Sequence, residues 1–277
     1  MKPIAKVYTA LLFLFLFAPI LIMLVFSFNS GNSLSVLDGF SLYWYKELFH
    51  DEDTLGALRN TLILALCAAL LSTIMGTAAA VGMNKLRSKY MKAAMNTVTN
   101  LPMVNPEIIT GISLMLLFVA YQRFATQSAW LPDNIMGLPT LLIAHIAFNV
   151  PYVIFNVSPK LKQLDIKLYE AALDLGCDPR QAFFKVILPE ISPAILSAFL
   201  ICLTYSIDDF MISYFNCGTV ETLPIAIYSM TRKKVSPEIY ALSTIMFVVI
   251  LSVILVSNAM ESRSYRRDQK TLRKEGA

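Results

Sequence analysis

The chain has 277 residues, of which 56% are hydrophobic and 15% are charged, and its mean hydropathy is +0.60. This composition excludes a soluble protein of ordinary type and indicates a polytopic membrane protein. The formal net charge of +4 comes from basic residues that flank the apolar segments, so it predicts an orientation in the membrane and is no evidence for a nucleic-acid partner.

Six segments are long and apolar enough to span a membrane, since a helix needs about 20 residues to cross ~30 Å of hydrocarbon. They are residues 7–28, 61–83, 95–120, 138–158, 191–214 and 239–260. We therefore predict an all-α polytopic membrane protein with six transmembrane helices. The first segment exceeds the core of a signal peptide and lacks an A-x-A site after it, so we expect it to remain as the first helix.

The chain is predicted to form a single transmembrane domain over residues 1–277. Residues 1–60 supply the first helix and an outer loop, residues 61–260 the core, and residues 261–277 a basic cytoplasmic tail. In the outer loop, "FSLYWYKELF" predicts a short helix at the membrane interface. Its Trp44 is either an aromatic anchor at the lipid headgroups or part of a substrate entrance.

Basic residues are distributed unevenly between the two sides of the membrane. With the amino terminus inside, the inner stretches hold 17 of the 23 lysines and arginines, which predicts that both termini are cytoplasmic. The outer stretch "TRKKVSP" (Arg232–Lys234) runs against this trend. No intrachain disulfide is expected, because Cys67 and Cys202 fall in spans, Cys177 inside and Cys217 outside.

The longest inner loop, residues 159–189, is predicted to fold as helix, glycine turn and helix. "IKLYEAALDL" is rich in helix formers, and Gly176 follows it where a left-handed terminator belongs. In "DPRQ", Asp178 and Pro179 suit the cap and first position of the next helix. The alanines at 171 and 172 leave one side of the first helix bare enough to enter a groove on a partner.

This loop resembles the EAA signature of bacterial ABC import permeases. The matching residues in "EAALDLGCDPRQAFFKVILP" are Glu170, Ala171, Ala172, Gly176, Leu188 and Pro189, and Val186 stands where the signature has isoleucine. The resemblance implies the type I importer (MetI-like) permease fold and a coupling helix that docks on a separate ATPase. The sequence contains no G-x-x-x-x-G-K-[ST] motif, so we expect no P-loop nucleotide site in this chain.

Further motifs make the chain similar to the C-type permease subunit of the spermidine/putrescine importers. They are Ser27–Ser30, Trp44–Tyr45, Asn105–Glu107, Ser206–Phe210, Leu223–Met230 and Val235–Glu238. This resemblance implies a bacterial cytoplasmic (inner) membrane protein that pairs with a second related permease, two copies of an ABC ATPase and an extracytoplasmic polyamine-binding protein. The ATPase would hold ATP and magnesium; no cofactor, metal or catalytic residue is expected in this chain.

Three acids, Glu107, Asp208 and Asp209, lie in predicted spans that contain no basic residue. Such acids usually face a cavity or mark a path for ions or substrate. Three interpretations remain open: hydrogen bonding within the protein, for which Tyr205 and Thr204 are spaced, a proton relay in a secondary carrier, or the anionic wall of a cation path. Because adjacent residues on a helix point about 100° apart, one aspartate can face the path while the other braces a neighbouring helix.

In the cation-path interpretation, Ser206 offers a hydroxyl to an ammonium group and Tyr205 offers a cation–π contact. Lone His145 is predicted to pack or to form a hydrogen bond between helices. The predicted function is therefore the permease subunit of an ATP-driven polyamine importer. The alternatives are a permease for iron, a phosphonate or thiamine and, in another class, a proton-coupled cation carrier that needs no ATPase.

Overall fold

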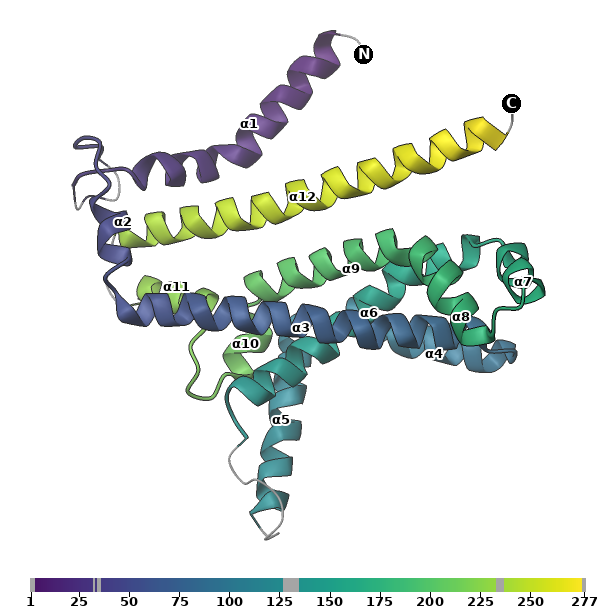
Figure 1. Cartoon of the computed structure of the whole chain (residues 1–277). Coiled ribbons are helices and arrows are strands. Elements are labelled where there is room, and N and C mark those ends of the chain that lie inside the picture. Colours follow the sequence, from purple (N-terminus) through teal and green to yellow (C-terminus); the bar gives the residue numbers. More distant parts are fainter. Residues whose placement is uncertain (1–2, 32, 34–35, 127–134, 233–236, 276–277) are drawn as a thin grey trace. The chain divides into compact units, whose positions relative to one another are not determined.

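The computed structural model describes residues 3–31, 33, 36–126, 135–232 and 237–275, and these residues are almost entirely helical (Figure 1). Within the described ranges, the one β contact is an isolated antiparallel bridge between Asn29 and Phe40. The helices are α1 (Pro3–Phe26), α2 (Tyr43–Leu48), α3 (Glu52–Lys85), α4 (Lys89–Val104), α5 (Glu107–Ala125), α6 (Leu138–Gln163), α7 (Ile166–Asp174), α8 (Pro179–Ala182), a π-helix (Phe183–Ile187), α9 (Leu188–Asp208), α10 (Met211–Asn216), α11 (Leu223–Arg232) and α12 (Glu238–Glu275).

Six helical segments of the described chain are long and apolar enough to cross a membrane, as predicted. They are Ala5–Phe26, Glu52–Lys85, Glu107–Ala125, Leu138–Gln163, Pro179–Asp208 and Glu238–Val256. The predicted all-α class is confirmed. Of the outer basic stretch, Arg232 ends α11, while Lys233 and Lys234 lie outside the described residues.

Two predicted spans have different limits in the structure. The segment expected at 95–120 is divided into α4 and α5 at Asn105, whose extended backbone (φ −75°, ψ 136°) follows from the proline after it. The segment expected at 191–214 ends at Asp208, and Asp209 is extended (φ −66°, ψ 118°) before α10 begins. The second break places the two aspartates at a helix end.

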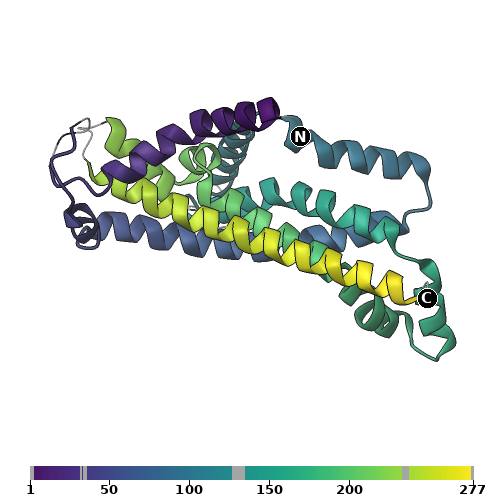
Figure 2. The same ribbon diagram turned by 90° about the horizontal axis from the view of Figure 1, so that it is seen from above.

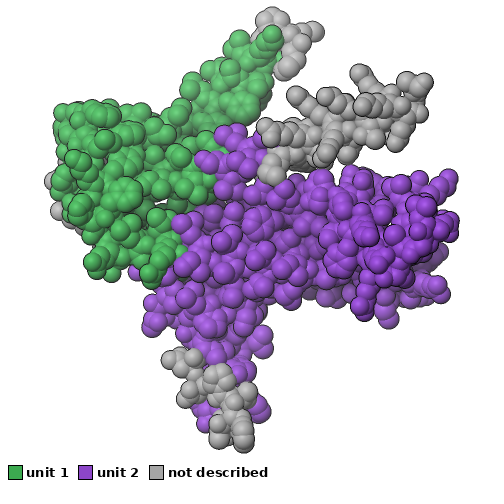
Figure 3. Space-filling view, in the orientation of Figure 1, with its two compact units in different colours: residues 1–59, 223–251 green, residues 60–222, 252–277 purple. Residues whose placement is uncertain are grey.

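The chain forms two compact units, shown in different colours in Figure 3. Unit 1 comprises residues 1–59 and 223–251, and unit 2 comprises residues 60–222 and 252–277. The first unit therefore holds α1, α2 and α11, and the second holds α4 to α10. The expectation of a single permease domain stays a prediction.

The core of unit 2 is formed where α3, α6 and α9 pack together; α6 (teal) and α9 (green) are neighbours (Figure 2). Small residues permit this close packing. A Cβ atom added to Gly76 of α3 would lie 2.5 Å from the Val153 Cβ of α6, so only glycine fits there. Gly76 belongs to the stretch "MGTAAAVG" (residues 75–82), whose small residues allow helices to approach closely.

In unit 1, the short helix predicted within residues 40–49 is present as α2, and its place at the membrane interface remains a prediction. Its Trp44 and Leu48 are buried, and the Tyr45 hydroxyl lies 2.8 Å from the Ser27 hydroxyl at the end of α1. The Asn29 side-chain amide donates to the Val36 carbonyl, and its oxygen accepts from the Asp38 amide. Asn29 therefore joins the end of α1 to the segment that leads into α2.

Candidate functional site: a carboxylate pair and a coupling loop

The break between α9 and α10 gives the two aspartates opposite environments. Asp208 is the last residue of α9 and its side chain is exposed, whereas Asp209 is 7% exposed. The Thr204 hydroxyl, which is spaced to reach Asp208, donates to the Leu200 carbonyl. Within the described residues, Asp208 has no ion-pair partner.

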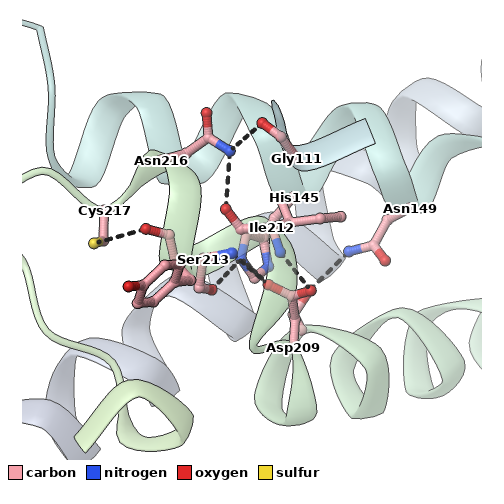
Figure 4. Close-up of polar contacts among 10 residues, drawn as sticks. Gly111, His145, Asn149, Asp209, Ile212, Ser213, Asn216 and Cys217 are labelled. Atoms are coloured by element: carbon pink, nitrogen blue, oxygen red, sulfur yellow. Dashed lines mark hydrogen bonds and ion pairs between the residues drawn. The ribbon is translucent and has the colours of Figure 1, made fainter. Parts of the chain in front are cut away.

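The Asp209 carboxylate is held by α10 and α6 (Figure 4). Its Oδ1 accepts from the Ile212 amide at 3.2 Å and its Oδ2 from the Ser213 amide at 2.7 Å. The Nε2 atom of His145 lies 3.5 Å from Oδ2 and 3.0 Å from the Ser213 hydroxyl. A carboxylate with these contacts caps α10 and braces α6, a role that the sequence analysis allowed for one of the two aspartates.

Glu107 opens α5 beside this break. Its side chain is exposed, and its carboxylate lies within electrostatic range of Asp209 and Asp208. The structure thus brings the start of α5, with Glu107, near the end of α9, where Asp208 and Asp209 lie. Two of them, Glu107 and Asp208, face outward from the described chain, and such carboxylates can bind a cation that the chain itself does not supply.

Ser206 and Tyr205, which the sequence analysis placed beside the acids, differ in their exposure. Ser206 is 3% exposed, and its hydroxyl accepts from the Asn149 amide at 2.8 Å. Tyr205 is 41% exposed and packs edge-on against Tyr152, with ring centroids 4.8 Å apart. Phe148 contacts both tyrosine rings. Tyr205 is therefore accessible, while Ser206 belongs to a buried hydrogen bond between α6 and α9.

Sequence reasoning missed Tyr152 and Asn149, both on α6. Tyr152 is partly buried and lies within electrostatic range of Glu107. The Asn149 side chain is fully buried, and its Oδ1 has no hydrogen-bond partner among the described residues. In the sequence, the apolar pattern of α6 gave no signal that would single out Tyr152 or Asn149. His145 was predicted to pack or to join two helices, and its contact with Ser213 confirms the second role.

Trp44 belongs to unit 1, whereas the acids belong to unit 2. Its ring is 8% exposed and packs edge-on against Tyr43, and its indole nitrogen has no hydrogen-bond partner among the described residues. The tryptophan is thus packed within its own unit. Its predicted place at a substrate entrance remains a prediction.

The predicted helix, glycine turn and helix of the inner loop are present as α7 and α8. Gly176 has φ +88° with open space around it, so the turn requires glycine for its backbone conformation alone. Asp178 caps α8 by accepting from the Gln181 amide at 2.8 Å, and Pro179 occupies the first helical turn. Local rules therefore determine the shape of this loop.

The side chains of α7 divide between an exposed and a buried face. Glu170 and Ala171 are exposed, whereas Ala172 is 7% exposed and packs inward. Of the residues after the loop, Leu188 packs against the core of unit 2, and Pro189 is exposed. The π-helix Phe183–Ile187, which the sequence did not predict, joins α8 to α9.

These features define a class of protein. Six helices long and apolar enough to span a membrane, an exposed helix that carries the EAA signature and a sequence without a P-loop motif are the features of the membrane subunit of an ABC importer. Residues 68–267 match the family described as "Binding-protein-dependent transport system inner membrane component". The chain belongs to this family, so it is a multi-pass membrane permease and not an enzyme.

Two curated relatives and one solved structure illustrate the relationship. The putrescine transport system permease protein PotI of Escherichia coli K12 is 41% identical over 237 residues, which cover 84% of this chain and 82% of PotI. The spermidine/putrescine transport system permease protein PotC of the same organism is 34% identical over 247 residues, 89% of each chain. A chain of the bacterial alginate ABC transporter, solved in complex with an alginate pentasaccharide-bound periplasmic protein, has a TM-score of 0.72 at 19% identity, covering 94% of this chain and 93% of that one. The last likeness shows the fold, that of the type I (MetI-like) permeases.

Proposed function

We propose that this chain forms half of the translocation path of an ATP-driven importer of polyamines such as spermidine and putrescine. The observation that carries the proposal is the pair of exposed carboxylates, Glu107 and Asp208, on membrane-spanning helices without an ion-pair partner among the described residues. A substrate with two or three ammonium groups supplies the missing positive charges. The names of PotI and PotC, which are related over more than four fifths of this chain, agree with that chemistry.

Aromatic rings complete the proposed cation path. Tyr205 is exposed next to Asp208, and Tyr152 packs against it on the side of Glu107. A desolvated ammonium group over an aromatic ring gains about 0.5–2 kcal/mol. Rings and carboxylates together therefore provide alternating contacts for the methylene and ammonium groups of a polyamine. An anionic substrate would be repelled by the same carboxylates.

The proposed assembly has four kinds of subunit. This chain pairs with a second related permease, and the two dock on two copies of an ABC ATPase, which bind ATP and magnesium. An extracytoplasmic binding protein delivers the polyamine, in keeping with the periplasmic protein bound to the alginate transporter. This chain holds no cofactor of its own and uses its α7 face, with Glu170 and Ala171 exposed, to receive the motion of the ATPase.

A transport assay tests the proposal directly. Proteoliposomes that contain the whole complex are expected to take up labelled putrescine and spermidine only when ATP and the binding protein are present. Uptake without the ATPase would favour a secondary carrier instead. A complex that hydrolyses ATP but takes up neither polyamine would contradict the proposed substrate class.

The proposed orientation places both termini in the cytoplasm, so Cys217 lies outside and Cys177 inside. In spheroplasts with single-cysteine variants, a membrane-impermeant maleimide is expected to label Cys217 directly and Cys177 only after permeabilisation. Burial, together with the nearby Glu221 carboxylate, raises the pKa of the Cys217 thiol. Because the thiolate reacts, its labelling rate is expected to rise about tenfold per pH unit until the pH passes this raised pKa. Labelling of Cys177 in intact spheroplasts would reverse the orientation.

A further inference from the structure

The short helix α10 is joined to α6 by hydrogen bonds at both of its ends, and Figure 4 shows the contact between Ser213 and His145. Near its start, the Ser213 hydroxyl lies 3.0 Å from the Nε2 atom of His145. At its end, the Asn216 carbonyl accepts from the Thr140 hydroxyl at 2.9 Å. All four residues are buried, so these contacts form without competition from water. Helix α10 is therefore a fixed part of the helix bundle.

The carboxyl end of α9 is joined to the start of α10. Asp209 follows α9 directly, and its carboxylate accepts from the Ile212 and Ser213 amides while contacting His145. Since Asp208 is the neighbouring residue, the position of its backbone is determined by this attachment.

The amino-terminal part of α5 also packs against α10. The Asn216 amide donates to the Gly111 carbonyl at 3.2 Å. A Cβ atom on Gly111 would lie 3.1 Å from the Phe215 ring and 3.2 Å from the Met211 carbonyl oxygen, so the two backbones approach closely only because residue 111 is glycine. Gly111 is one helical turn after Glu107 and on the same helix face. The contact therefore sets the position of Glu107.

We infer that α10 is a spacer between the two carboxylates of the cation path, and that Gly111, Asn216 and His145 are positioning residues that determine which polyamine length is preferred. The inference rests on the proposed function. None of these residues needs to touch the substrate. They act through Glu107 and Asp208, which come from separate helices and are joined through α10.

Carboxylate spacing matters because the ammonium groups of a polyamine are separated by a fixed number of methylene groups. Putrescine presents two charges and spermidine presents three over a longer chain. A pair of carboxylates held at one separation suits one spacing of charges better than another, and small displacements of positioned groups have large effects on rate. A change in α10 packing is therefore expected to alter the ratio of the two KM values.

The test compares Gly111→Ala with two controls in proteoliposome uptake. Gly82→Ala adds the same methyl group to a helical glycine with open space around it, and Val153→Ala weakens the core of unit 2 away from α10. Gly111→Ala is expected to change the ratio of the spermidine and putrescine KM values by about threefold or more, because it displaces Glu107. Both controls are expected to leave the ratio unchanged, although Val153→Ala lowers the amount of assembled complex.

A second variant, Asn216→Ala, removes the side-chain hydrogen bond to α5 without adding bulk. If Gly111→Ala does not assemble, the KM ratio of the Asn216→Ala complex tests the spacer role. An unchanged KM ratio in an assembled Gly111→Ala or Asn216→Ala complex would overturn the spacer role.

The Asp208→Asn variant separates the two proposals. If that variant loses uptake while the KM ratio stays constant in the Gly111→Ala and Asn216→Ala complexes, the spacer role alone fails. If the wild-type complex transports no polyamine, the proposed function fails with it.

Discussion

Asp208→Asn is expected to lower the efficiency of polyamine uptake (maximal rate over KM) by about tenfold or more, because it removes one of the two exposed charges of the proposed cation path. Asp208 is exposed at the end of α9 and has no ion-pair partner among the described residues, so the substitution is expected to leave the folded chain intact. Assembly of the complex and its basal ATPase activity are therefore expected to stay at the wild-type level. The measurement is ATP-dependent uptake of labelled spermidine and putrescine.

Two further variants serve as comparisons for Asp208→Asn in this experiment. Glu221→Gln removes an exposed acid from a loop outside the helices and is expected to transport normally, so it controls for a general loss of negative charge. Asp209→Asn weakens the cap of α10 and is expected to lower the amount of assembled complex, because one of its two accepting oxygens is lost. Normal uptake by an assembled Asp208→Asn complex would remove this residue from the cation path.

Glu170→Arg is expected to abolish uptake, to below about a tenth of the wild-type rate, by placing a positive charge on the exposed face of α7 where the ATPase is proposed to dock. The isolated chain should fold normally, since Glu170 is exposed. Substrate-stimulated ATP hydrolysis by the complex is expected to fall together with uptake, and it is measured with the ATPase present. Lys85→Glu, at the end of α3, reverses a charge at another exposed position and serves as the matched control.

Two results distinguish docking from folding. Ala172→Glu places a charge on the buried side of α7 and is expected to reduce the amount of folded chain, in contrast to Glu170→Arg. Binding of the ATPase to the Glu170→Arg complex with wild-type affinity and activity would contradict the proposed coupling role of α7.

The coupling loop was predictable from sequence because its shape depends on local chemistry. A glycine with positive φ ends α7, and an Asp-Pro pair starts α8; each choice is dictated by the residues themselves. The six spans were predictable from hydropathy for the same reason. The limits of the third and fifth spans were wrong because apolar residues continue past Asn105 and Asp209, so hydropathy does not register the change of backbone direction there.

The candidate site was only partly predictable, because its contacts join distant parts of the chain. The three acids were visible in the sequence as charges within apolar segments. Which aspartate is buried depends on His145 and Ser213, and these contacts exist only after α6 and α10 have packed. Tyr152 was missed for the same reason, since its neighbour Tyr205 belongs to another helix.

The π-helix Phe183–Ile187 changes the direction in which the side chains of α9 point around the helix axis. Its hydrogen bonds skip one residue more than those of an α-helix, as shown by the Leu188 amide, which donates to the Phe183 carbonyl. An extra residue in one turn rotates the downstream helix by about 100° relative to an uninterrupted α-helix. The direction in which α9 presents Asp208 is therefore determined at the opposite end of the span, close to the loop proposed to receive the ATPase.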